Sequence, residues 1–94
     1  MVTVEFDRLA VKPGFKILDI GCGSGRHTCA AYQCPNVTVI GADLNFKDLT
    51  EAGERLRQHD RMGEHGGGVW GLLMADVTCL PFKDDYFEIV ICSE

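Results

Sequence analysis

A glycine-rich turn between two segments of opposite character constrains the fold more than any other feature of the sequence. Residues 15–20 before it form a short, mostly apolar run, which predicts a β-strand buried on both faces. The turn itself is Gly21-Cys22-Gly23-Ser24-Gly25. Glycines allow a tight turn and a close backbone approach to a ligand, because no Cβ stands in the way. Residues 26–33 after the turn predict a short helix that ends before Pro35.

The following segments continue this alternation of strand and helix. Residues 37–42 are apolar and rich in β-branched side chains, which predicts a second buried strand. Asn45 can cap a helix over residues 46–61. Residues 69–75 and 86–92 predict a third and a fourth strand. The inner face of the long helix is predicted from apolar or small residues at helical spacing, namely Phe46, Leu49, Ala52, Gly53 and Leu56.

The order of these segments predicts an α/β fold. We expect a Rossmann-like, doubly wound and mostly parallel sheet with helices on both faces, interrupted after its fourth strand. The glycine-rich connection 63–68 is expected to be flexible, and residues 76–85 are expected to cross between the last two strands largely as loop. Because an open strand edge pairs readily with another chain, we also expect self-association through residues 86–92.

Composition excludes several classes of protein. The net charge of −5 argues against a nucleic-acid-binding surface, which needs a concentrated basic patch. Apolar stretches are too short for a membrane span, and residues 1–14 contain no apolar signal core, so a cytoplasmic protein is expected. Five cysteines, with no Cys-x-x-Cys pair, indicate buried thiols rather than disulfides or a zinc site. A metal site could be drawn only from the cluster Cys22, Cys29, Cys34 and His27, and small buried thiols are the stronger interpretation.

Asp43 together with the glycine turn indicates which kind of ligand the turn binds. It ends the second predicted strand, at the spacing where folds of this kind bind ribose, because a carboxylate can accept two hydrogen bonds from a vicinal diol. The rival interpretation is a nicotinamide or flavin dinucleotide site, with the pattern G-x-G-x-x-G. Arg26 stands where that pattern needs its third glycine, and Asp19 would repel a pyrophosphate. The residues therefore disfavour a dinucleotide.

Four motifs occur in a characteristic order: residues 17–25, residues 41–44, Ala75-Asp76 followed by Leu80-Pro81-Phe82, and residues 87–94. With this order and spacing, residues 11–94 resemble the class I S-adenosylmethionine-dependent methyltransferases, especially the small-molecule group that includes ubiquinone and menaquinone methyltransferases. The resemblance implies that residues 1–94 are the N-terminal, cofactor-binding part of a single methyltransferase domain.

The resemblance also implies a role for each matched position. Asp19 would neighbour the ammonium of the methionine, Asp43 would bind the ribose hydroxyls, and Asp76 would accept from the adenine amino group. Leu44 would pack on the adenine, and the backbone N–H of Val77 would face a ring nitrogen. The residues expected to line the methionine and ribose are Gly21, Cys22, Gly23 and Gly25, with Cys92 and Ser93 on the methionine side.

The implied reaction is direct displacement, in which an unidentified, small-molecule acceptor attacks the methyl group and takes it from the sulfonium sulfur, which leaves. No catalytic residue is assigned, since His27, the nearest base, has a helical position more typical of packing or surface. Two alternatives stay open. One is aminopropyl transfer in the manner of spermidine synthases, and the other is a non-catalytic module that retains only affinity for the cofactor.

Overall fold

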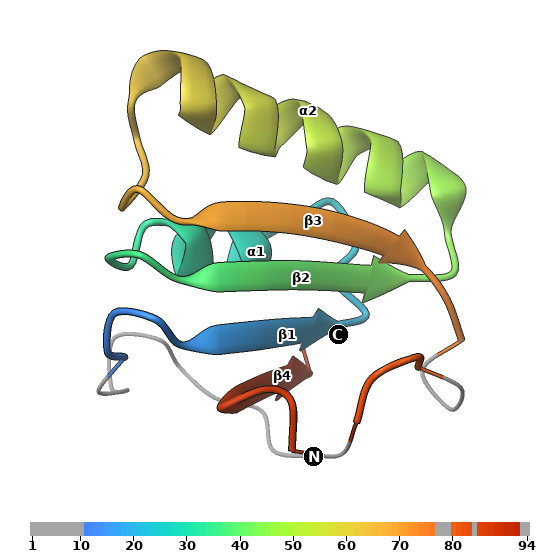
Figure 1. Ribbon diagram of the computed structural model, residues 1–94. Helices are drawn as coiled ribbons and strands as arrows, with labels where there is room; N and C mark the ends of the chain where they lie inside the picture. Colours follow the sequence, from blue (N-terminus) through green and yellow to red (C-terminus); the bar gives the residue numbers. More distant parts are fainter. Residues whose placement is uncertain (1–10, 77–79, 84, 93–94) are drawn as a thin grey trace.

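The computed structural model describes residues 11–76, 80–83 and 85–92. Its elements alternate as the sequence predicts, and the last strand is shorter than expected (Figure 1). In chain order they are β1 (Lys16–Ile20), α1 (Arg26–Tyr32), β2 (Thr38–Asp43), α2 (Phe46–Met62), β3 (Val69–Met74) and β4 (Ile89–Cys92).

The strands form a single parallel sheet in the order β3-β2-β1-β4. β1 is central, with Ile17 opposite Val39 of β2 on one side and Ile89 of β4 on the other. The chain moves outward from β1 to β3 and then returns to the far side of β1. This reversal is the switch point at which doubly wound sheets bind ligands, just beyond the carboxyl ends of the strands. The predicted Rossmann-like α/β fold is confirmed.

One face of the sheet packs against both helices. Ile17 and Val39 are fully buried there, together with Tyr32 of α1 and Leu56 of α2. Burial of a leucine-sized side chain contributes about 2 kcal/mol, so this layer fixes the helices on the sheet. Asn45 caps α2 as predicted, because its side chain accepts a hydrogen bond of 3.1 Å from the backbone N–H of Asp48.

Phe46 departs from its predicted place in the inner face of α2, since its side chain is 72% exposed. The other predicted positions are buried: Leu49, Ala52, Gly53 and Leu56. Phe46 is the first residue of the helix and lies at the margin of the buried layer, where it lines an open hollow with Leu72 and Met74 of β3.

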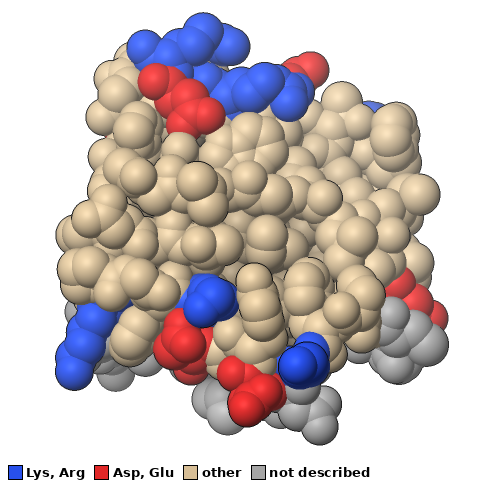
Figure 2. All heavy atoms as spheres, in the orientation of Figure 1, with Lys and Arg blue, Asp and Glu red and all other residues tan. Residues whose placement is uncertain are grey.

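The opposite face of the sheet differs from the expectation of helices on both sides. In the described part of the chain both helices lie on one face, and Leu80, Phe82 and Phe87 pack against Leu18 and Ile20 on the other. Right-handed crossovers that step in one direction place their helices on the same face, and only the return from β3 to β4 crosses the other face. Figure 2 shows a broad uncharged area across that side, with charged residues gathered at its margins.

The glycine-rich connection between α2 and β3 is held in place, although the sequence predicted a flexible one. Gly66 accepts a hydrogen bond of 3.0 Å from the backbone N–H of Asn36. A Cβ on Gly66 would lie 2.2 Å from the carbonyl oxygen of Cys34, and one on Gly68 would lie 1.9 Å from that of Val37. These glycines therefore serve a close approach of two backbones.

Candidate ligand site at the carboxyl edge of the sheet

The glycine turn lies at the carboxyl end of β1 and is tied to the end of β2. The backbone N–H groups of Gly21 and Cys22 donate to the carbonyl oxygen of Ala42, at 2.8 and 3.1 Å. Gly25 has a left-handed conformation with φ of 89°, and a Cβ there would lie 2.8 Å from the Cβ of Ala52. Glycine at this position lets the start of α1 pack directly on α2.

Asp43 joins the turn to the start of α2. Its Oδ2 accepts from the backbone N–H of Gly23 at 2.9 Å, and its Oδ1 accepts from that of Asn45 at 2.9 Å. Each carboxylate oxygen can accept a second hydrogen bond, and the side chain is only partly buried. Asp43 thus shapes the turn and keeps acceptor capacity for a ligand.

Asp19 lies beneath the turn rather than on its surface. Its side chain is 0% exposed, and its Oδ2 accepts a hydrogen bond of 2.7 Å from the hydroxyl of Thr28. Thr28 belongs to the buried side of α1 and is itself 0% exposed. Sequence reasoning missed this residue, although a threonine on the inward side of the helix that follows the turn was a usable signal.

Cys22 reports the electrostatic character of the turn. Burial is the main cause that raises the pKa of its thiol to about 12, and the negative charges of Asp19 and Asp43 contribute to the same shift. Cys22 is therefore a neutral thiol in a field of negative potential. A cation is favoured in such a field, whereas an anion is repelled.

The remaining predicted positions follow the carboxyl ends of the strands where they are described. Leu44 is 65% exposed directly after Asp43, and Asp76 is exposed shortly after β3. Cys92 ends β4, opposite Ile20 of β1, and is half-buried. Val77 and Ser93 lie outside the described residues. The structure thus brings the described candidates to one edge of the sheet.

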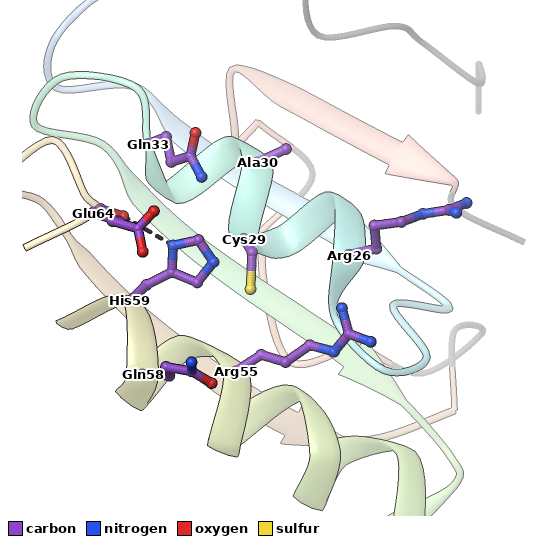
Figure 3. Close-up of a pocket in the computed structure, with 8 residues that line it drawn as sticks. All are labelled: Arg26, Cys29, Ala30, Gln33, Arg55, Gln58, His59 and Glu64. Carbon is purple, nitrogen blue, oxygen red and sulfur yellow. Dashed lines mark hydrogen bonds between the residues drawn. The ribbon is translucent and has the colours of Figure 1, made fainter. Parts of the chain in front are cut away.

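Two hollows meet at Arg26 and Arg55. One, of about 340 Å³, is lined by the turn itself together with these arginines and His27. The other, of about 600 Å³, lies between α1 and α2 (Figure 3). Its lining residues are Arg26, Cys29, Ala30, Gln33, Arg55, Gln58, His59 and Glu64.

The larger hollow is a groove on the helical layer and not a part of the sheet edge. In Figure 3 the sulfur of Cys29 and the ring of His59 face this space from opposite helices. The Nδ1 atom of His59 lies 3.0 Å from the backbone oxygen of Glu64. Among the described residues, no group of three or more His, Cys, Asp or Glu is placed to hold a metal ion. Within the same part of the chain, no helix has the length and apolar character to span a membrane.

Comparison with known proteins gives consistent matches. A family model described as a methyltransferase domain matches residues 17–94. The methyltransferase GfsG of Streptomyces halstedii is 33% identical over 92 residues, which are 95% of this chain and 30% of that protein. The ubiquinone/menaquinone biosynthesis C-methyltransferase UbiE of Burkholderia vietnamiensis is 35% identical over 82 residues, which are 85% of this chain and 31% of that protein. The chain spans about a third of the length of these relatives.

A solved structure supports the fold independently. The S-adenosylmethionine-dependent methyltransferase of Thiobacillus denitrificans, in complex with S-adenosyl-L-homocysteine, superposes with a TM-score of 0.68. The match covers 87% of this chain and 31% of that one, at 21% identity. At this identity the likeness concerns the fold.

Proposed function

The chain belongs to the methyltransferase domain family, and from this we propose that it forms the N-terminal, cofactor-binding part of an S-adenosylmethionine-dependent methyltransferase acting on a small molecule. The observation that carries the proposal is the position of Asp43. Its carboxylate bridges the glycine turn and the start of α2, at the sheet edge where ligands of such folds bind.

The backbone of the turn supports this proposal. A Cβ on Gly23 would meet nothing within 4 Å, so the space above this residue is open. Gly23 also has a positive φ of 55°, which L side chains rarely adopt. The turn therefore offers a bare backbone surface, and we assign the methionine and ribose of the cofactor to it, with Gly21, Cys22 and Gly25 completing the surface.

The hydrogen-bonding capacity of Asp43 fits a ribose. One acceptor site on each oxygen is taken by the protein, which orients the carboxylate and leaves further sites for the two hydroxyls of a diol. Leu44 and Asp76 extend the same edge, and we assign the adenine to them. Val77 and Ser93, which lie outside the described residues, stay proposed contacts on the strength of the family pattern.

The charge of S-adenosylmethionine also fits the glycine turn. S-adenosylmethionine supplies a methyl group activated by a positively charged sulfonium, beside a positively charged ammonium. Asp19 and Asp43 create negative potential at the turn, as the raised pKa of Cys22 indicates. Because Asp19 is fully buried, we assign it an effect through charge rather than a direct contact with the ammonium.

The chain's part in the reaction is to bind and orient the donor and to exclude water. No general base is assigned to it.

The remaining proposals concern the surroundings of the domain. The acceptor is proposed to be a small molecule, as implied by the family. Among the described residues β4 pairs with β1 only, so its other edge is proposed to pair with a second copy or a further strand. The thiols of Cys22, Cys29, Cys34 and Cys92 are free, which supports the reducing cytoplasm as the compartment.

A transfer assay tests the proposal. The protein is incubated with S-adenosylmethionine labelled in the methyl group and with a panel of quinol, phenol and amine acceptors. Label in an acceptor supports methyl transfer. Transfer from decarboxylated S-adenosylmethionine to an amine would instead support the aminopropyl alternative. Saturable cofactor binding without any transfer would leave the chain a binding module, and micromolar NAD binding would overturn the cofactor assignment.

A further inference from the structure

Thr28 is a polar residue sealed inside the molecule between α1 and β1. It is 0% exposed, and its hydroxyl lies 2.7 Å from Oδ2 of Asp19, which is also 0% exposed. A hydrogen bond to a charged acceptor of this length is among the stronger ones in proteins. The contact joins the middle of the first turn of α1 to the strand that carries the glycine turn.

Neighbouring groups confine the hydroxyl of Thr28. A Cβ on Gly41 of β2 would lie 3.1 Å from Oγ1 of Thr28 and 3.0 Å from Sγ of Cys22. Gly41 therefore leaves just enough room for both side chains beside the backbone of β2. The hydroxyl has a single proton to donate, and at 2.7 Å it donates a hydrogen bond to the Asp19 carboxylate, which accepts it.

This bond bears on the charge of Asp19. Burial of a carboxylate favours its neutral form, and hydrogen bonds to the ionised form oppose that tendency. The charge of Asp19 is felt at Cys22, since it helps to raise the pKa of that thiol. Cys22 lies within the turn, so a ligand resting on the turn experiences the same field.

We propose that Thr28 is a positioning residue for the cofactor site, whose hydroxyl holds the Asp19 carboxylate ionised and in place beneath the glycine turn. The carboxylate then attracts the positively charged methionine end of S-adenosylmethionine. This inference rests on the proposed function, and it assigns to Thr28 an electrostatic role that packing alone does not supply.

The test compares two ligands that share an adenosine. S-adenosylmethionine carries the sulfonium and the ammonium, whereas 5′-methylthioadenosine is uncharged and lacks the amino acid. Dissociation constants are measured by calorimetry for the wild type, Thr28→Val and Thr28→Ser. Because Thr28→Val removes a hydrogen bond to a charged group, we expect it to raise the dissociation constant of S-adenosylmethionine about tenfold or more. The dissociation constant of 5′-methylthioadenosine stays within about twofold of the wild-type value, and Thr28→Ser restores wild-type affinity for S-adenosylmethionine.

Two further variants separate positioning from packing. Thr28→Val in an Asp19→Asn background produces no additional loss of S-adenosylmethionine affinity, because the charge that Thr28 holds is already gone. Thr50→Val is the matched control: its exposed hydroxyl donates to the backbone of Phe46 at 3.0 Å, and its removal leaves both affinities unchanged. Thr28→Ala is measured in parallel, so that a folding failure of Thr28→Val does not end the test.

The outcomes are distinct. Equal weakening of both ligands in a folded Thr28 variant, or additive losses in the double variant, overturns the positioning role. A wild-type protein that binds neither ligand contradicts the proposed function itself.

Discussion

Asp43 and Gly23 are joined by a hydrogen bond of 2.9 Å between the carboxylate Oδ2 and the backbone N–H, across 20 residues of sequence. The same carboxylate binds the N–H of Asn45 through Oδ1. One side chain thereby sets the distance between the glycine turn after β1 and the helix that follows β2. A ligand that spans these two elements meets a site already shaped for it.

Replacement of Asp43 tests this shaping. Asp43→Asn keeps an acceptor but loses the charge, and the loss of charge-assisted bonds predicts weaker S-adenosylmethionine binding by about 1.5–3 kcal/mol. Glu54→Ala is the control, because this acid is exposed and lies more than two turns into α2, beyond the start of the helix that Asp43 contacts. Calorimetry measures both variants. Equal affinity in Asp43→Asn and wild type would remove Asp43 from the site.

A methyl group on Gly25 is expected to destabilise the fold. Gly25→Ala places a Cβ 2.8 Å from that of Ala52, at a φ of 89°. Overpacking and backbone strain of this kind each cost about 1–3 kcal/mol. Chemical denaturation measures the loss. Because glycine inside a helix itself costs about 1 kcal/mol, Ala52→Gly is measured in the wild type and in Gly25→Ala, and it should cost less in Gly25→Ala, where it also removes the contact between the two Cβ atoms. An equal cost in both would show that strain in the backbone accounts for the whole effect.

Gly68 and Gly63 form a matched pair in the connection between α2 and β3. A Cβ on Gly68 would lie 1.9 Å from the backbone oxygen of Val37, whereas one on Gly63 would meet nothing within 4 Å. Gly63→Ala costs about 1–2 kcal/mol, because only its positive φ of 69° is unfavourable. Gly68→Ala is expected to cost more, since two backbones must separate. Comparable unfolding midpoints for the two variants would contradict this account.

The raised pKa of Cys22 predicts a loss of stability at high pH. The folded state holds this thiol protonated up to a pKa of about 12, whereas the ordinary pKa of a cysteine thiol is 9.0. The stabilisation is complete below pH 9 and disappears as the pH rises through the folded value. The unfolding free energy should therefore fall between pH 9 and 12, and less steeply in Cys22→Ala. An identical slope in the variant would show that Cys22 does not contribute.

Local patterns in the sequence predicted local structure well. The cap at Asn45 and the buried side of α2 at Leu49, Ala52 and Leu56 depend on residues a few positions apart, and all are confirmed. The expected burial of Phe46 was wrong. Burial at the first residue of a helix depends on what the rest of the fold places beside it, and a helical pattern does not contain that information.

Contacts between distant segments were the part that the sequence did not reveal. The bond from Thr28 to Asp19 and the approach of Gly68 to Val37 arise only once the strands and helices are packed. The placement of both helices on one face could have been predicted from the order of the elements, because two right-handed crossovers in the same direction require it.

Backbone NMR determines whether the cofactor binds at the carboxyl edge of the sheet. Amide signals of the ¹⁵N-labelled protein are followed during titration with S-adenosylhomocysteine. Binding at this edge predicts saturable shifts concentrated at Gly21, Gly23, Asp43 and Leu44. Shifts centred instead on Gln58 and His59, in the groove between the helices, or no saturable shift at all, would contradict it.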